Sequence, residues 1–163
     1  MKTNAKGGFN RGETIDLNIT RLFKAPRELV FAVWSDVEHF KRWWGPADCV
    51  MSDLEFDFRV GGALRCRLVH EDGDYWMRGE FREIAEPERI VFTHGWENER
   101  GEIETETLIT VRFFAEGDAT RMVFFQQGFL SNESRDSHEE GWSSCLDRLL
   151  DYIAREYGAP QGG

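Results

Sequence analysis

The side chains best suited to chemistry in this sequence are a few imidazole and amide groups that alternate with apolar neighbours. In a strand, residues two positions apart point to the same face. His94 therefore shares a face with Phe92 and Trp96, and His70 shares a face with Cys66. A few polar groups among apolar walls are typical of a pocket that binds a small molecule.

The C-terminal segment adds a further histidine to this set. Apolar residues from Trp142 to Ile153 recur at helical spacing, which predicts one long amphipathic helix over about 132–157. His138 and Cys145 fall on the same side of this helix as Trp142. If that side covers the predicted strand faces, the helix completes the pocket.

The segment 119–129 is apolar on both faces, so alternation leaves two possibilities. Either Gln126 faces the pocket with Phe124, or Gln127 faces it with Phe125. Our candidate set takes the second face. The predicted cavity residues are Trp44, Cys66, His70, Phe92, His94, Trp96, Phe125, Gln127, His138, Trp142 and Cys145. The alternative from the residues alone is a filled aromatic core in which each polar group is satisfied locally.

Two adjacent tryptophans, Trp43 and Trp44, come just before Gly45-Pro46. Tandem indoles at a helix end can form a pocket lid or an exposed binding patch. The alternative, which we favour, is that one ring plugs the open end of the sheet and the other packs on the preceding helix.

The motifs of several enzyme classes do not occur. The Gly61-Gly62 pair lacks phosphate-loop spacing and predicts a hairpin or bulge. Cys66 and Cys145 lie on apolar faces, where thiols are usually inert. His94 or His138 could act as an acid or base, but no catalytic residue can be assigned. The acidic clusters after His70 and His138 lack metal-site spacing, so we expect no metal and no cofactor.

Composition narrows the possible partners and location. The chain has 163 residues, six Trp, thirteen Phe and a formal net charge of -10. Such a charge disfavours nucleic acid and anionic membranes as partners. Three cysteines without a CxxC motif indicate reduced thiols. With no signal-like or membrane-length apolar run, we expect a cytoplasmic protein.

Periodicity and turn residues predict an α+β domain. One strand at 14–23 is followed by two short helices that begin at Pro26 and end before Gly45. Six strands follow near 50–58, 63–70, 75–85, 89–96, 105–116 and 119–129, and the long helix comes last. Short strands joined by tight turns form an antiparallel meander, and the last helix must cover one face of it. We expect one domain at 14–157 between flexible tails at 1–13 and 158–163.

Several blocks of sequence resemble a known family. "RLFKAPRELVFAVWSDVEHFKRWWGP" (21–46), "DFRVGGALR" (57–65), "GEFREIAEPERIVFTHGW" (79–96) and "GWSSCLDRLLDYI" (141–153) resemble, in order, the domain named after the activator of the ninety-kilodalton heat-shock chaperone's ATPase. That family belongs to the START-like, or SRPBCC, superfamily. The resemblance implies a helix-grip fold, a curved sheet of about seven strands around the long helix, with a hydrophobic cavity between them.

Three functions are compatible with this resemblance. The first is binding of a small hydrophobic or aromatic ligand in the cavity. The second is a cofactor-free cyclase or hydrolase that uses the same cavity, although we lean away from an enzyme. The third is a co-chaperone-like module that binds a chaperone through an exposed Trp43 or Trp44 and the acidic surface.

Overall fold

The structure of the protein is a computed structural model that describes residues 15–157. The predicted tails at 1–13 and 158–163 lie outside the described residues. The strands are β1 (Ile15–Phe23), β2 (Val50–Phe56), β3 (Ala63–His70), β4 (Gly73–Ala85), β5 (Arg89–Trp96), β6 (Thr107–Glu116) and β7 (Ala119–Phe129). The helices are α1 (Arg27–Ser35), α2 (Val37–Trp43) and α3 (Asn132–Tyr157). The elements follow one another in the predicted order.

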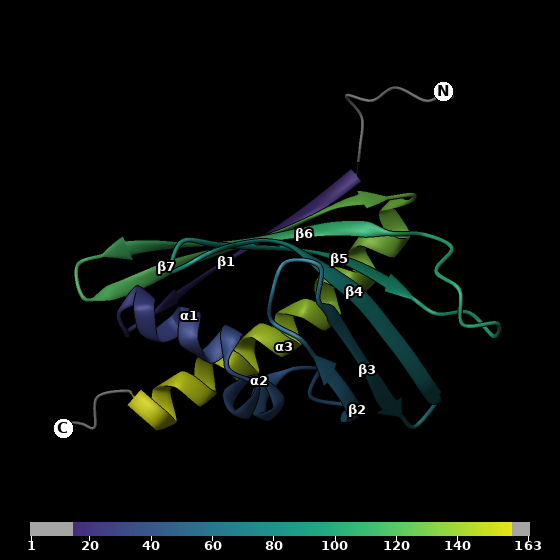
Figure 1. The fold of residues 1–163 in the computed structure, drawn as a ribbon, viewed down its shortest axis with the longest axis horizontal. Helices are drawn as coiled ribbons and strands as arrows, with labels where there is room; N and C mark the ends of the chain where they lie inside the picture. Colours follow the sequence, from purple (N-terminus) through teal and green to yellow (C-terminus); the bar gives the residue numbers. More distant parts are fainter. Residues whose placement is uncertain (1–14, 158–163) are drawn as a thin grey trace.

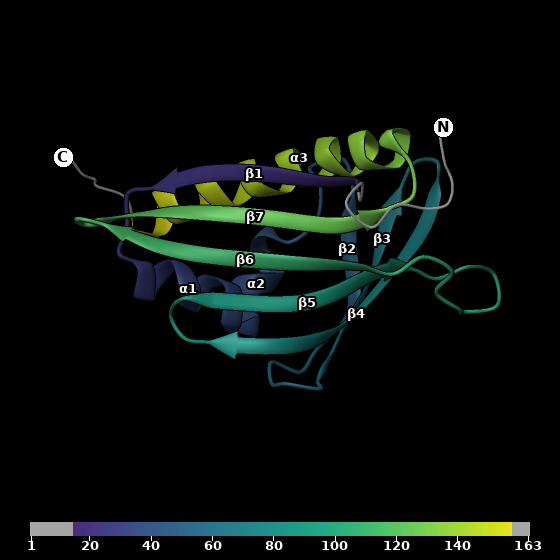
Figure 2. The ribbon, with the colours of Figure 1, turned by 90° about the horizontal axis from the view of Figure 1, so that it is seen from above.

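The strands of the described residues form one antiparallel sheet in the order β1-β7-β6-β5-β4-β3-β2. Consecutive strands from β2 to β7 are neighbours, whereas β1 pairs with β7 at the far edge (Figure 2). The sheet bends strongly, so that β2 and β3 turn away from the direction of β1, β7 and β6 (Figure 1). The predicted curved antiparallel sheet is confirmed.

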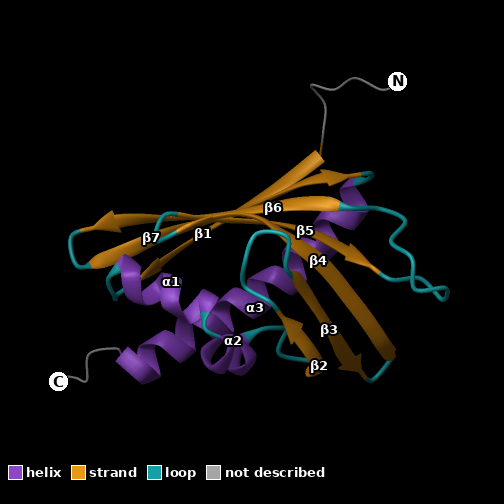
Figure 3. Cartoon of the chain, viewed as in Figure 1, coloured by secondary structure: helices purple, strands orange, loops and turns teal. Residues whose placement is uncertain are grey.

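Helices α1, α2 and α3 lie on the concave side of the sheet, and α3 runs across it (Figure 3). The buried side of α3 is the predicted stripe, with Trp142, Cys145, Leu146 and Leu149 each at most 8% exposed. Burial of this face is the main source of the stability of such a helix. The helix-grip arrangement is therefore confirmed. Within residues 15–157, no helix is both long and apolar enough to cross a membrane.

The two tryptophans at the end of α2 are buried. Asp36 caps this helix by accepting the backbone N–H of Glu38 at 2.9 Å. Trp43 is fully buried, and its ring centroid lies 4.8 Å from that of Trp34 in α1. Trp44 is only 3% exposed. The expected alternative of an exposed tryptophan patch is therefore wrong. Trp43 packs on the preceding helix, as the favoured interpretation expected for one of the two rings.

Strand β7 carries a bulge that alternation alone does not reveal. Ile15 of β1 pairs with Phe129, but Asp16 pairs with Gln127, so Gly128 is left without a partner. Gly128 adopts φ +109°, a conformation that side-chain-bearing residues rarely adopt. The extra residue turns Phe129 to the inner face together with Gln126, where both are buried.

Candidate functional site

A pocket of about 480 Å³ lies between the inner face of the sheet and helix α3. Six predicted cavity residues line it: Trp44, His94, Trp96, His138, Trp142 and Cys145. They come from the end of α2, from β5 and from α3, which are far apart in sequence. The concave sheet brings them together because the inner face of β5 lies opposite the buried stripe of α3.

The other five predicted residues do not line this pocket. Cys66 and Phe92 point inward but are fully packed within the core, at 0% and 1% exposed. His70 lies at the end of β3, where its Nε2 is 3.1 Å from Asp48 Oδ2. Phe125 and Gln127 lie on the outer face of β7, because Phe124 and Gln126 occupy the buried positions of the alternation.

Gln126, which the sequence offered as the alternative to Gln127, fixes the position of Trp142. The indole N–H of Trp142 donates to Gln126 Oε1 at 2.7 Å, and Gln126 Nε2 donates to Thr107 Oγ1 at 2.8 Å. Thr107 Oγ1 in turn donates to the backbone oxygen of His94 at 3.1 Å. This chain of hydrogen bonds ties α3 to β7, β6 and β5. It also fixes the Gln126 amide, which is fully buried, in one orientation.

Both ring nitrogens of His138 are hydrogen-bonded to other groups of the protein. Trp96 Nε1–H donates to His138 Nε2 at 2.9 Å, so this nitrogen is an acceptor without a proton. The proton of the neutral ring is then on Nδ1, which donates to the Ser134 backbone oxygen at 2.8 Å. His138 therefore closes the pocket as a structural link between β5 and α3.

Among the buried side chains that line the pocket, His94 is the polar one with no hydrogen bond inside residues 15–157. Its side chain is 2% exposed, and no group within residues 15–157 makes a hydrogen bond to its ring nitrogens. Aromatic rings surround it edge to face, with centroids at 5.2 Å for Trp96, 5.4 Å for Trp142 and 5.9 Å for His138. Burial, with a smaller contribution from His138, lowers the pKa of His94 to about 3. The ring is thus neutral at physiological pH.

Helix α3 also holds the loop that forms the pocket wall at Gly45. Arg148 Nη1 donates to the Gly45 oxygen at 2.8 Å, and the Gly45 N–H donates to Cys145 Sγ at 3.3 Å. Gly45 adopts φ +103°, and a Cβ there would lie 3.2 Å from Leu68 Cδ2. A side chain at this position would therefore be strained and would crowd the pocket.

The thiols in and beside the pocket are poor nucleophiles. Burial raises the pKa of Cys145 to about 12 and that of Cys66 to about 11. Burial and the neighbouring Asp48 also raise the pKa of Cys49, which lines the pocket and is partly exposed. Since the thiolate is the reactive form, the site does not favour thiol chemistry at neutral pH. Within the described part of the chain, no cluster of three or more His, Cys, Asp or Glu could hold a metal ion.

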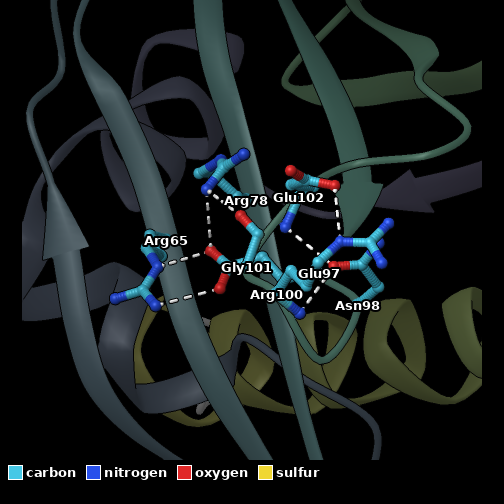
Figure 4. Close-up of polar contacts among 7 residues, drawn as sticks. All are labelled: Arg65, Arg78, Glu97, Asn98, Arg100, Gly101 and Glu102. Atoms are coloured by element: carbon cyan, nitrogen blue, oxygen red, sulfur yellow. Dashed lines mark hydrogen bonds and ion pairs between the residues drawn. The ribbon is translucent and has the colours of Figure 1, made fainter.

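A network of ion pairs fixes the end of β5 directly after Trp96 (Figure 4). The Glu97 carboxylate is 6% exposed and accepts two hydrogen bonds from Arg65, at 2.6 and 3.0 Å, and one from Arg78, at 3.2 Å. Arg78 also donates to the Gly101 backbone oxygen at 3.2 Å. These arginines, of which Arg65 contributes most, lower the pKa of Glu97. The network anchors the β5–β6 connection at the rim of the pocket.

Several lining residues were not among the predicted ones. Gly45, Pro46 and Cys49 belong to the connection between α2 and β2, which has no strand alternation, whereas Tyr75 lies near the start of β4. Strand β4 begins at Gly73, two residues earlier than predicted. The alternation of Tyr75 with Met77 was a signal available in the sequence.

The curved sheet, the long helix and the pocket between them define a START-like helix-grip domain, a class of ligand-binding and chaperone-regulating domains. The chain belongs to the family described as Activator of Hsp90 ATPase homolog 1-like protein, whose model matches residues 24–154. The resemblance of the sequence blocks to this family is therefore confirmed. Comparison with the curated proteins gives no match.

Solved bacterial structures share the fold. The AHSA1 protein of Silicibacter pomeroyi is 27% identical, with a TM-score of 0.81, and the match covers 88% of this chain and 100% of that one. A protein of Rhizobium leguminosarum is 29% identical, with a TM-score of 0.70 and coverage of 88% and 97%. A protein of Arthrobacter aurescens is 24% identical, with a TM-score of 0.78 and 91% coverage of both chains, which supports the fold alone.

Proposed function

We propose that the protein binds a small, uncharged hydrophobic ligand in the pocket between the sheet and α3, with His94 as its polar anchor. The observation that carries this proposal is the His94 imidazole, which is 2% exposed, lines the pocket and has no hydrogen-bond partner within residues 15–157. Buried polar groups are generally paired. A ligand with one hydrogen-bonding group would supply the partner that His94 lacks.

The other polar groups at the pocket are either paired or exposed to solvent, which supports the choice of His94. Tyr75 and Ser137 line the pocket from exposed positions. Both nitrogens of His138 are hydrogen-bonded to the protein, and Gln126 is fully engaged with Trp142 and Thr107. The pocket wall contains no Asp, Glu, Lys or Arg. Burying an unpaired charge is costly, so such a wall favours an uncharged ligand. The volume of about 480 Å³ is in the range of small-molecule sites.

A cyclase or hydrolase in the same pocket has weaker support. A general base works best when its pKa is near the operating pH. The pKa of His94 is about 3, so the neutral imidazole is a weak base at physiological pH. Together with the raised pKa of Cys145, this favours binding over acid–base or nucleophilic catalysis.

A chaperone-regulating role has the support of the family description. Of the two features that the sequence suggested for it, the exposed tryptophans are absent, because Trp43 and Trp44 are 0% and 3% exposed. Ligand binding therefore takes precedence in our proposal. The three free thiols are compatible with a reducing compartment, and we propose the cytoplasm.

A thermal-shift screen tests the binding function. Purified protein is screened with uncharged hydrophobic compounds, each in two forms that differ only in one hydroxyl or carbonyl group. A ligand at about a hundred times its dissociation constant adds about 2.7 kcal/mol to the unfolding free energy. We expect the polar form of a hit to stabilise more than the hydrocarbon form, and His94→Phe to abolish this difference.

His70→Phe is the matched control, because it removes a histidine that lies outside the pocket. It should bind both forms as the unaltered protein does. If His94→Phe keeps the preference for the polar form, His94 is not the anchor. If no compound in a broad set stabilises the protein, the binding function loses its support.

A further inference from the structure

Trp96 borders three separate hollows. It lines the main pocket, and it also lines a second hollow of about 250 Å³ between the end of β5, the end of β7 and the start of α3. A third, open hollow of about 690 Å³ lies on its outer side, near the Glu97 network. Among the residues that line these spaces, Trp96 is common to all three.

The second hollow lies next to the main pocket. The two spaces share His94, Trp96 and His138 in their walls, so they adjoin at these residues. The remaining wall of the second hollow includes Phe129 and Leu130, and Leu130 is 77% exposed. Apolar surface therefore continues on the other side of the Trp96 ring.

The position of the Trp96 ring depends on few contacts. Its indole N–H donates to His138 Nε2 at 2.9 Å, and the ring packs edge to face against His94 and, at a centroid distance of 6.3 Å, against Tyr75. The side chain is 37% exposed, unlike the buried Trp44 and Trp142. The Trp96 ring therefore borders both spaces without being part of the packed core.

We propose that Trp96 determines the length of the ligand: the bulk of its indole ring ends the main pocket and keeps the ligand out of the second hollow. This inference rests on the proposed binding function. The expected ligand is an uncharged molecule. It has one hydrogen-bonding group for His94 and an apolar body that fits within about 480 Å³. With a small residue at position 96, the same polar anchor serves a longer apolar body, because His94 also faces the second hollow.

The test measures the affinity of straight-chain primary alcohols of increasing length by isothermal titration calorimetry. Each buried methylene raises the affinity by about fourfold until the available space is filled. In the unaltered protein the affinity should therefore stop rising at a certain chain length. We expect Trp96→Ala to move this limit to longer alcohols and Trp96→Leu to move it part of the way.

Trp96→Phe is the control, since it loses the hydrogen bond to His138 but keeps most of the ring. It should retain the limit of the unaltered protein. An unchanged limit in Trp96→Ala and Trp96→Leu, or an equal extension in Trp96→Phe, would overturn the role of the ring while leaving the binding function intact. If none of the proteins binds any of the alcohols, both proposals fail.

Discussion

The indole nitrogen of Trp142 donates a 2.7 Å hydrogen bond to the side-chain oxygen of Gln126, and through Thr107 this pair is tied to the backbone of His94. The helix that covers the pocket and the strand that carries its free imidazole are thus positioned by one polar chain. Gln126 satisfies the buried N–H of Trp142, and it does so without presenting a polar group to the ligand.

Replacing Gln126 with Leu should destabilise the protein. The substitution leaves the Trp142 N–H and the Thr107 hydroxyl without their buried partner, which typically costs about 1–3 kcal/mol. Urea unfolding should show this loss. Gln127→Leu is the matched control on the outer face, where a surface change is usually within about 0.5 kcal/mol. Equal losses in the two variants would contradict the assigned role of Gln126.

The fold and half of the site were predictable from the sequence for a physical reason. Strand β5 and helix α3 have clear periodicity, so His94, Trp96, His138 and Trp142 were assigned to the correct faces. Burial of an apolar face dictates such patterns, and they are visible before any tertiary contact is known.

The prediction of pocket residues was wrong where the hydrophobic periodicity does not distinguish the two faces of a strand or is interrupted. Both faces of β7 carry large apolar residues, and the bulge at Gly128 moves Phe129 to the face opposite Gln127. Alternation also shows which face a side chain points to but not how deeply it is buried. Phe92 points inward as predicted, but it is packed within the core and does not line the pocket. The loop residue Cys49 follows no period at all.

Neutralising Glu97 should loosen the end of β5. Glu97→Gln removes the charge that pairs with Arg65 and Arg78, and we expect a loss of about 1.5–3 kcal/mol, as for hydrogen bonds to charged groups. The pKa of Glu97 is lowered in the fold, so its contribution is present above the ordinary carboxyl pKa of 4.5 and is lost as the pH falls below it.

Urea unfolding at pH 7 and at pH 3 measures this effect. The gap between Glu97→Gln and the unaltered protein should be present at pH 7 and shrink at pH 3. Glu99→Gln is the control, because Glu99 is exposed and has no cationic partner within residues 15–157. A gap of the same size at both pH values would mean that charge pairing is not the cause.

The three thiols should differ in their reaction with iodoacetamide in the native protein at pH 8. Cys49 is partly exposed, whereas Cys66 and Cys145 are buried with pKa values of about 11 and 12. We expect mass spectrometry to find slow labelling of Cys49 and none of the other two until denaturant is added. Cys49→Ser should remain unlabelled when native, and labelling of Cys145 in the folded state would contradict its burial.

Removing His94 should make the protein more resistant to acid. The folded state keeps the pKa of His94 at about 3, below the ordinary value of 6.5, so the unfolded chain binds a proton that the folded chain does not. Stability is therefore unaffected above pH 6.5 and falls as the pH drops from 6.5 towards 3. At pH 4.5 this amounts to a loss on the order of 3 kcal/mol, from the free energy equivalent of a pKa shift.

Urea unfolding of His94→Phe and the unaltered protein at pH 7.5 and 4.5 isolates this effect, because the carboxylates act equally in both. The variant should lose about 3 kcal/mol less on acidification, whatever its stability at pH 7.5. An identical acid loss in the two proteins would show that His94 takes up its proton in the folded state, and hence that water reaches the pocket despite its aromatic wall.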